Sequence, residues 1–217
     1  GASTLQLTGI TSGSSFPVGT TNNLFEVTDA VGLKAQCIKK ITVLDTENPI
    51  ITSCPSNISM FATAGTCTAA ATWSAPTATD NCAAVTFTTN HASGATFTAG
   101  VTAVNYVAKD NALNSAVCNF TVTVTDNQLP VVTCPSNISI SAAANCTVAV
   151  TYTATATDNC AISTLTSVPA SGSSFAFGVS TVTYTAKDIH NNSAVCSFTV
   201  NVTDNVAPVV TCPANIT

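Results

Sequence analysis

The stretch Thr125–Ser139, TDNQLPVVTCPSNIS, decides the fold because the chain contains it three times. A looser copy, DTENPIITSCPSNIS, occupies Asp45–Ser59, and another, TDNVAPVVTCPANIT, occupies Thr203–Thr217. Other markers keep the same period, since Cys82 and Cys160 stand 78 residues apart. A fixed internal period has to be settled before a fold is assigned. A period of this length suits a small independent β domain.

The repeat divides the chain into two complete copies and two partial ones. We expect complete repeats at residues 47–125 (the first full repeat) and 126–203 (the second full repeat). Residues 1–46 match only the back part of a repeat, and residues 204–217 match only its front strand. Two explanations of the partial copies stay open. Either the chain is a window on a longer array, or the tail of one copy adds a strand to the incomplete domain of the next and builds a filament.

Apolar and polar residues alternate with a period of two inside each repeat. Thr181–Asp188, TVTYTAKD, sets apolar residues against threonine, and Phe120–Asp126, FTVTVTD, does the same. This alternation is typical of half-buried antiparallel strands, and clusters such as ATDNC mark the turns between them. We therefore predict an all-β fold of tandem immunoglobulin-like β-sandwiches, with about seven strands in each repeat. Trp73 and Tyr152 occupy equivalent positions and are expected in the core rather than as sugar-stacking platforms.

Composition and charge exclude several functions. Charged residues make up 7% of the chain, arginine is absent and the net charge is −5, so no nucleic-acid partner is expected. No apolar run approaches the ~20 residues of a membrane span, and no signal peptide is recognisable. The chain has neither a nucleophile elbow nor a phosphate loop. His91 and His190 stand at non-equivalent loop positions, where solvated side chains are expected. We predict no enzymatic activity.

The ten cysteines indicate disulfides. Their spacings are not those of zinc sites, so a disulfide framework is the better interpretation. Disulfides at this density form in an oxidising compartment. The sequence therefore predicts an extracellular or cell-surface protein.

The complete repeats carry a family pattern. Each contains C-P-x-N-I, then A-T-D-N, S-G-x-x-F, A-K-D and N-S-A-V-C-x-F-T-V-x-V in that order. This pattern resembles the hyalin repeat, or HYR domain, a module similar to immunoglobulin and fibronectin III domains. The resemblance implies an extracellular protein of adhesive or structural role without catalytic activity. The extra pair of cysteines in each repeat is more similar to bacterial surface repeats.

The same resemblance suggests a disulfide pairing. In an immunoglobulin-like sandwich the Cys-Pro cysteine starts the first strand and the late cysteine starts the last strand, so the two lie at one end. The favoured pairs are Cys54–Cys118 and Cys134–Cys196. The remaining cysteines of the full repeats then pair as Cys67–Cys82 and Cys146–Cys160. An alternative joins Cys82 to Cys118. Cys37 and Cys212 are left to pair outside these repeats or between subunits.

Aspartates recur at three repeat positions, which raises the question of a metal. Calcium takes six to eight oxygen ligands from carboxylates and carbonyls. The candidate calcium ligands are Asp45, Asp80, Asp110, Asp126, Asp158, Asp188 and Asp204. The junction sequence T-D-N-x-x-P is also loosely similar to the calcium-dependent linkers of cadherins. The competing interpretation is that these residues build turns by bonding to their own backbone.

Seven N-x-S/T sequons are candidate glycosylation sites in a source that modifies asparagine. They stand at Asn57, Asn119, Asn137, Asn145, Asn191, Asn201 and Asn215. Together the observations predict a structural or adhesive repeat protein that forms a stalk, fibre or filament at a cell surface. Its expected partners are neighbouring repeats or copies of itself. The alternative is a binding module of a surface adhesin that recognises a glycan or a protein.

Overall fold

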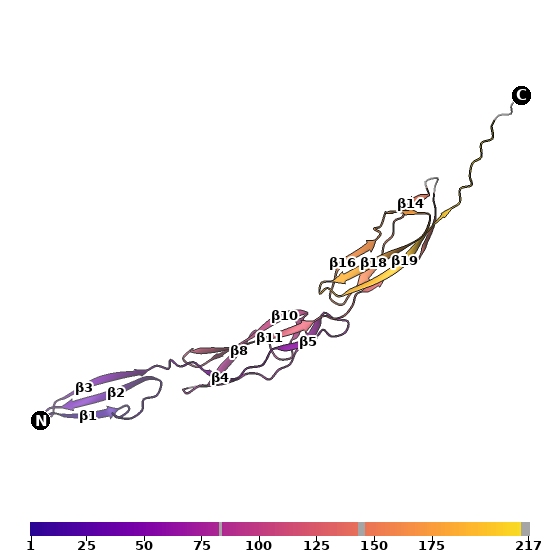
Figure 1. Cartoon of the computed structure of the whole chain (residues 1–217). Helices are drawn as coiled ribbons and strands as arrows, with labels where there is room; N and C mark the ends of the chain where they lie inside the picture. Colours follow the sequence, from indigo (N-terminus) through magenta and orange to yellow (C-terminus); the bar gives the residue numbers. More distant parts are fainter. Residues whose placement is uncertain (83, 143–145, 214–217) are drawn as a thin grey trace. The chain divides into compact units, whose positions relative to one another are not determined.

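The computed structural model describes residues 1–82, 84–142 and 146–213, and all of their regular structure is β-strand (Figure 1). The all-β fold class is therefore confirmed. The chain forms two compact units, which consist of residues 1–58, 72–95 and 102–122, and of residues 59–71, 96–101 and 123–217. The tip of the first full repeat (59–71 and 96–101) thus belongs to the same unit as the second full repeat. Within the described ranges, no helix is long and apolar enough to cross a membrane.

Residues 1–46 form one antiparallel sheet of three strands. Its strands are β1 (Ser3–Thr8), β2 (Gly19–Thr28) and β3 (Lys34–Val43), in that order. Among these residues only Asn23 and Glu26 are buried. Hydrogen bonds from Lys34 and Gln36 hold the pKa of the Glu26 carboxyl below its usual value. The backbone hydrogen bonds between its strands therefore stabilise this sheet more than a packed core does.

The first full repeat has eight strands in its described part, one more than expected. They are β4 (Ile50–Ser53), β5 (Ile58–Phe61), β6 (Thr68–Ala70), β7 (Thr77–Thr79), β8 (Thr86–Thr89), β9 (Thr96–Thr98), β10 (Gly100–Lys109) and β11 (Ser115–Thr125). Four of them make a sheet in the order β5-β11-β10-β8. The other four pair as the two-stranded ladders β4-β7 and β6-β9.

The second full repeat reproduces this topology. Its strands are β12 (Val131–Thr133), β13 (Ile138–Ala142), β14 (Thr147–Ala149), β15 (Thr155–Thr157), β16 (Ile162–Val168), β17 (Ser174–Ala176), β18 (Gly178–Asp188) and β19 (Ser193–Asp204). The large sheet has the order β13-β19-β18-β16, and Figure 1 shows its strands β16, β18 and β19 side by side. The ladders β12-β15 and β14-β17 complete the repeat.

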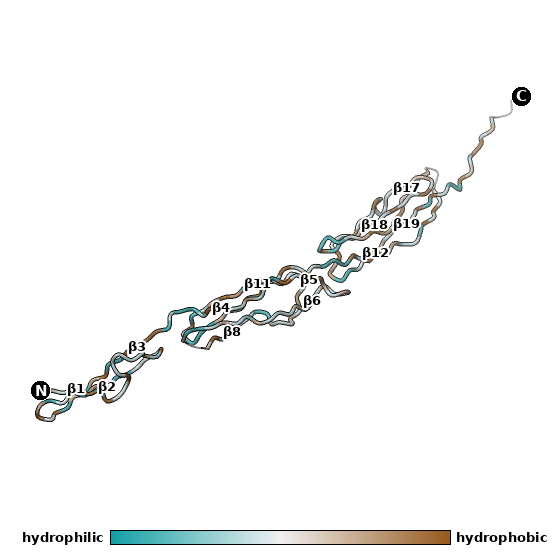
Figure 2. Tube along the Cα trace, turned by 60° about the horizontal axis from the view of Figure 1, so that its bottom comes forward, coloured by the Kyte–Doolittle hydropathy of each residue, from teal (hydrophilic) through white to brown (hydrophobic). Residues whose placement is uncertain are grey.

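The core of the second full repeat lies between the large sheet and the two ladders. Alternate residues of β18 and β19 are buried, as period-two alternation requires, and Val182 and Val200 among them are 0% exposed. Tyr152 packs in this core with its ring centre 5.1 Å from that of Phe198. Burial raises the pKa of the Tyr152 hydroxyl. Figure 2 shows that hydrophilic residues gather in loops at the strand ends, which is where polar side chains are available for a site.

Trp73 has the same role in the first full repeat. Its ring meets Phe120 edge to face at a centroid distance of 5.2 Å, and its Nε1 donates to the Tyr106 hydroxyl at 2.9 Å. An indole that is half-buried and hydrogen-bonded in this way stabilises the core. Neither Trp73 nor Tyr152 is a free aromatic platform for a sugar.

Candidate cation site and the inter-repeat disulfide

Two disulfides lie within the full repeats. They join Cys54 to Cys118 and Cys134 to Cys196, which are the pairs favoured from the sandwich topology. Cys54 follows β4 instead of starting it, and Cys118 lies inside β11 at a buried position. Each bond therefore links the segment between the first two strands of a repeat to its last strand.

The third disulfide connects the two full repeats. Cys67 is bonded to Cys160 across 93 residues, with the Cα atoms 4.5 Å apart. The expected pairs Cys67–Cys82 and Cys146–Cys160 are therefore wrong, and so is the alternative that joined Cys82 to Cys118. The thiols of Cys82 and Cys146 are free and exposed, as are those of Cys37 and Cys212.

Strand topology explains why the expected pairs do not form. Cys146 stands near the end of the second full repeat where β13 and β19 finish together, since Ala142 is opposite Asp204. Cys160 follows β15, whose last residue, Thr157, lies opposite Val131 at the start of β12. The two loops therefore lie at opposite ends of one sandwich. A disulfide needs Cα atoms within about 7 Å, so such loops cannot be bridged.

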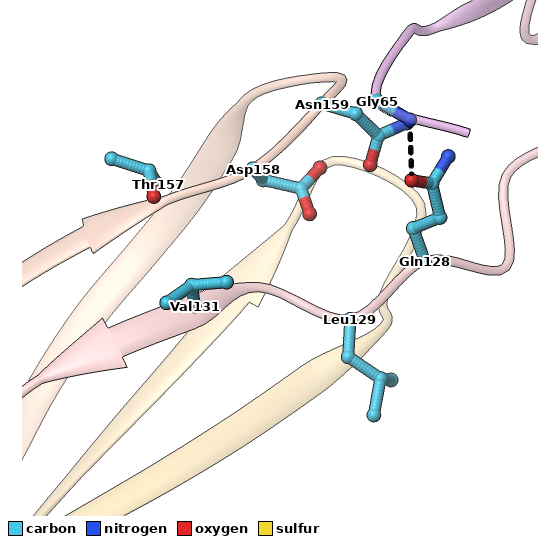
Figure 3. A pocket seen from close by; sticks show the side chains of 7 residues that line it. All are labelled: Gly65, Gln128, Leu129, Val131, Thr157, Asp158 and Asn159. Carbon is cyan, nitrogen blue, oxygen red and sulfur yellow. Dashed lines mark hydrogen bonds between the residues drawn. The ribbon is translucent and has the colours of Figure 1, made fainter. Parts of the chain in front are cut away.

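Hydrogen bonds accompany the disulfide where the tip of the first full repeat meets the second. The Gly65 N–H donates to Gln128 Oε1 at 2.8 Å, as Figure 3 shows. The Asn159 amide donates to the Thr66 carbonyl at 2.8 Å. A pocket of about 300 Å³ lies here, and Figure 3 shows the Asp158 carboxylate directed into it. The pocket is lined by Gly65, Gln128, Leu129, Val131, Thr157, Asp158 and Asn159.

Two carboxylates meet beside this pocket. Oxygens of Asp126 and Asp158 lie within 4.8 Å of each other, and the Asp126 side chain is 0% exposed. Asp126 Oδ1 accepts from the Asn159 amide at 3.1 Å, but its Oδ2 is buried without a hydrogen-bond partner. Asp158 Oδ2 accepts from the Cys160 N–H at 2.9 Å, and its buried Oδ1 also lacks a partner. Buried carboxylate oxygens are costly unless a donor or a cation satisfies them.

His190 is the third titratable group of this cluster. Its Nδ1 lies 3.4 Å from Asp126 Oδ2, and that nitrogen too is buried without a hydrogen bond. The expectation of a solvated loop histidine is therefore wrong, because the side chain is only 26% exposed. The signal that could have revealed it was its place two residues after Asp188, in the same turn.

The donor set suits a hard cation. Asp126 Oδ2 lies near the His190 nitrogen but accepts no hydrogen bond, and neither does the buried Asp158 Oδ1. The Asn159 Oδ1 is a third buried oxygen that accepts none. The Cys160 sulfur is held in a disulfide, so it does not act as a soft ligand. Carboxylate and amide oxygens are the ligands that Ca²⁺ takes, with carbonyls or water completing its shell. The residues therefore fit Ca²⁺ better than zinc.

The residues equivalent to Asp126, Asp158 and Cys160 meet at the start of the first full repeat. Ligand atoms of Asp45, Asp80 and Cys82 lie within 4.8 Å of one another, and both aspartates are partly exposed. Here the thiol is free. Loss of hydration raises the pKa of the Cys82 thiol, and the negative charges of Asp45, Asp80 and Glu47 raise it further. Ala112 stands at the position equivalent to His190.

Asp110 and Asp188 have a different task from the other candidate ligands. Asp188 is 1% exposed, its Oδ1 accepts from the backbone of His190 and Asn192, and its Oδ2 accepts from the Asn192 amide. Asn192 in turn donates to the Asp126 carbonyl at 3.2 Å. Asp110 makes the equivalent contacts with Asn114. These aspartates build turns that hold the junction backbone, while exposed Asp204 accepts only from the Val206 N–H among the described contacts.

The candidate glycosylation sites divide into three groups. Asn57 and Asn137 are exposed, and the Oδ1 of each accepts from a backbone N–H at 2.9 Å. Asn119 and Asn191 are exposed, and Asn201 is half-buried. Asn145 and Asn215 lie outside the described residues. Glycosylation at these positions stays a prediction.

Comparison with known proteins shows the family. The model of the HYR domain matches residues 44–124 and 125–202. The chain belongs to the HYR domain family. It is 39% identical over 94% of its length to Hyalin from Strongylocentrotus purpuratus, and 34% identical over 93% of its length to Hyalin from Lytechinus variegatus. The segment spans 18% and 40% of these relatives. HYR membership and the disulfides make it an extracellular repeat segment.

More distant similarities lie in animal proteins. A segment of 125 residues is 30% identical to part of the sushi, von Willebrand factor type A, EGF and pentraxin domain-containing protein 1 of Rattus norvegicus, and it covers 56% of this chain and 3% of that protein. Among solved structures, mouse cadherin-23 EC22-24 is similar with a TM-score of 0.37 and 15% identity, over 86% of this chain and 75% of that one. The expected bacterial origin is not tested by these similarities.

Proposed function

We propose that the chain is a structural and adhesive segment of an extracellular protein, and that it forms part of a stalk or fibre at a cell surface. The observation that carries this proposal is the Cys67–Cys160 disulfide, which ties one full repeat to the next. A module whose only task was to display a binding loop would not need a covalent bond to its neighbour. A segment under tension gains from one, because the bond limits how far the chain between Cys67 and Cys160 can extend when the other contacts break.

The contacts around the bond support the same function. Gly65–Gln128 and Asn159–Thr66 hydrogen bonds lie beside the disulfide, so the chain of contacts continues from one repeat into the next. The relatives named Hyalin contain many more residues than this segment, which suits a long array of repeats. The partners would be neighbouring repeats or copies of the same protein.

Calcium is the second part of this proposal. Ca²⁺ bound by Asp126 and Asp158 would satisfy the two buried carboxylate oxygens that lack partners. It would also neutralise two negative charges beside the Cys160 disulfide, and so stabilise the loop that makes the inter-repeat contacts. Asp45 and Asp80 would hold a weaker site of the same kind, because they are more exposed to water.

A glycan-binding module has less support. The two aromatic residues that would offer stacking surfaces, Trp73 and Tyr152, are used in the cores of their repeats. The pocket at the junction is lined mainly by short polar and aliphatic side chains. Surface glycans as partners therefore stay the alternative function.

Electron microscopy of the native protein that carries this segment tests the proposal. Samples would be imaged in Ca²⁺ and after chelation with EDTA. The proposal predicts long, uniform, thin particles in Ca²⁺ and more bent particles in EDTA. Compact globular particles in both conditions would contradict the structural role. Thin particles that EDTA leaves unchanged would support the structural role and would contradict the proposed role of Ca²⁺.

A further inference from the structure

Cys82 and Cys146 are the two cysteines of the full repeats that form no disulfide in this chain. Their repeat equivalents do form one. Cys82 corresponds to Cys160, since each ends the sequence A-T-D-N-C. Cys146 corresponds to Cys67, since each stands directly before a short strand that begins with threonine. The bonded pair therefore shows what these two positions do when a neighbouring repeat is present.

The local structure that presents each sulfur is the same at the free and the bonded positions. The Cys82 N–H donates to Asp80 Oδ1 at 2.9 Å, and the Cys160 N–H donates to Asp158 Oδ2 at 2.9 Å. These bonds fix both cysteines in equivalent aspartate turns, which follow the fourth strand of each full repeat, β7 and β15. The free Cys82 thus already has the backbone setting of a bonded Cys160.

Cys67 and Cys146 also have equivalent backbone settings in their repeats. The Cys67 carbonyl accepts from the Ala99 N–H at 2.9 Å, and the Cys146 carbonyl accepts from the Phe177 N–H at 3.1 Å. Both cysteines lead directly into equivalent ladders, β6-β9 and β14-β17. The free Cys146 is therefore held at the same end of its repeat as Cys67 is held in the repeat before it.

We propose that Cys146 and Cys82 each form an inter-repeat disulfide of the Cys67–Cys160 kind with an adjoining HYR repeat. Cys146 bonds to the cysteine of the Cys160 type in the repeat that follows, and Cys82 bonds to the cysteine of the Cys67 type in the repeat that precedes. Each full repeat then carries one sulfur for each neighbour. An array of such repeats is joined through one disulfide at every junction, in addition to the bond inside each repeat.

The bond forms by oxidation of two thiols. A thiolate attacks a small disulfide such as oxidised glutathione, and one glutathione thiol leaves. The second cysteine thiolate then attacks the mixed disulfide, and the other glutathione thiol leaves. The two cysteines lose two electrons and two protons, and the small disulfide gains them as two thiols.

An extended chain tests the proposal. A second copy of residues 126–203 is inserted between Thr203 and Asp204, so that Cys146 gains a following repeat and the rest of the chain is unchanged. The protein is refolded in a glutathione buffer, its free thiols are alkylated, and its disulfides are mapped by mass spectrometry without reduction. We expect a peptide that joins Cys146 to the Cys160 of the inserted copy, and loss of Cys146 alkylation relative to the original chain.

Controls keep the result interpretable. The amount of the Cys134–Cys196 peptide reports whether both copies have folded, since it should double relative to the original chain. The variant Cys146→Ser of the extended chain should leave the inserted Cys160 fully alkylated and keep the Cys67–Cys160 bond. The proposal is overturned if the inserted copy is folded while Cys146 and the inserted Cys160 both stay alkylated. It is equally overturned if Cys146 bonds to Cys160 of its own repeat and releases Cys67.

Discussion

Cys67 and Cys160 lie 93 residues apart in the sequence and are joined by a disulfide whose Cα atoms are 4.5 Å apart. The bond connects the loop before β6 in one repeat to the turn after β15 in the next. It stands beside Asp158 and Asn159, so the covalent connection and the candidate cation site share one turn.

Removing the inter-repeat bond should weaken the second unit. The double variant Cys67→Ser/Cys160→Ser avoids leaving an unpaired thiol. We expect its free energy of unfolding to fall by about 2–4 kcal/mol, because the unfolded chain regains the freedom that the bond removes. Urea denaturation followed by circular dichroism measures the change. The variant Cys82→Ser is the matched control, since its thiol is free, and a similar loss in that variant would contradict the prediction.

Calcium should stabilise the folded chain through Asp126. At about one hundred times its Kd, a ligand that binds only the folded state adds about 2.7 kcal/mol to stability. We expect Ca²⁺ to raise the Tm of the original chain and to leave that of Asp126→Asn nearly unchanged. Without Ca²⁺, Asp126→Asn should be the more stable of the two, because one of two close carboxylates is gone. Asp204→Asn serves as control and should keep the full response to Ca²⁺.

The reactivity of Cys82 should report on the charges around it. The thiolate is the nucleophile, so a raised pKa slows alkylation at neutral pH, and the rate should keep increasing above the pH at which an ordinary thiol levels off. Replacing Asp45 with asparagine removes one of the negative charges and should lower the pKa of the Cys82 thiol. We expect iodoacetamide to modify Cys82 faster in Asp45→Asn than in the original chain at pH 7.5. Mass spectrometry of the Cys82 peptide over time measures the rate.

Calcium gives the same assay a second use. Ca²⁺ bound at Asp45 and Asp80 places positive charge beside the thiol and should also accelerate the alkylation of Cys82. Cys37 in the same sample is the internal control, because no aspartate pair is grouped with it in the described structure. Equal rates at Cys82 with and without Ca²⁺ would show that Asp45 and Asp80 bind no Ca²⁺. The expected effect of Asp45→Asn on the pKa of the Cys82 thiol would not change.

Asp188 should matter for stability without binding any cation. Asp188→Ala removes three hydrogen bonds to a buried carboxylate and leaves the donors of its turn without their partner. We expect a loss of about 3 kcal/mol in the free energy of unfolding. Asp29→Ala is the matched control: Asp29 has the same repeat position but is exposed, so the loss should be below about 1 kcal/mol. Comparable losses in the two variants would contradict the role assigned to Asp188.

The strands could be predicted from the sequence because burial imposes a local pattern. Val182 and Tyr184 point into the core at alternate positions, and threonines fill the positions between them. Repetition strengthened the prediction, since Trp73 and Tyr152 had to serve the same purpose in two copies. Phe97 and Phe175 are likewise buried in both copies.

The third disulfide could not be predicted from the same signals. In a periodic sequence, a bond from Cys67 to Cys82 and a bond from Cys67 to Cys160 lead to the same cysteine spacing in every repeat. Only the direction of the strands separates the two, because it decides which end of the sandwich each loop occupies. The assumption that a repeat closes its own bonds was what made the expected pairs wrong.

The candidate site was predicted in part for a related reason. The three aspartate positions stood out because they recur, but recurrence does not show which oxygens are already occupied. Asp188 uses both of its oxygens in its turn, whereas Asp126 and Asp158 each have a buried oxygen that accepts no hydrogen bond. His190 was missed because it occurs in only one copy, and its contact with Asp126 crosses 64 residues of sequence.

Disulfide mapping of the 217-residue chain, without further repeats, tests the central claim most directly. The protein is alkylated under native conditions, digested without reduction and analysed by mass spectrometry. The account predicts a peptide pair joined through Cys67 and Cys160, together with alkylated Cys82 and Cys146. A pair joined through Cys67 and Cys82, with Cys146 bonded to Cys160, would contradict it. Every disulfide of the full repeats would then lie within a single repeat.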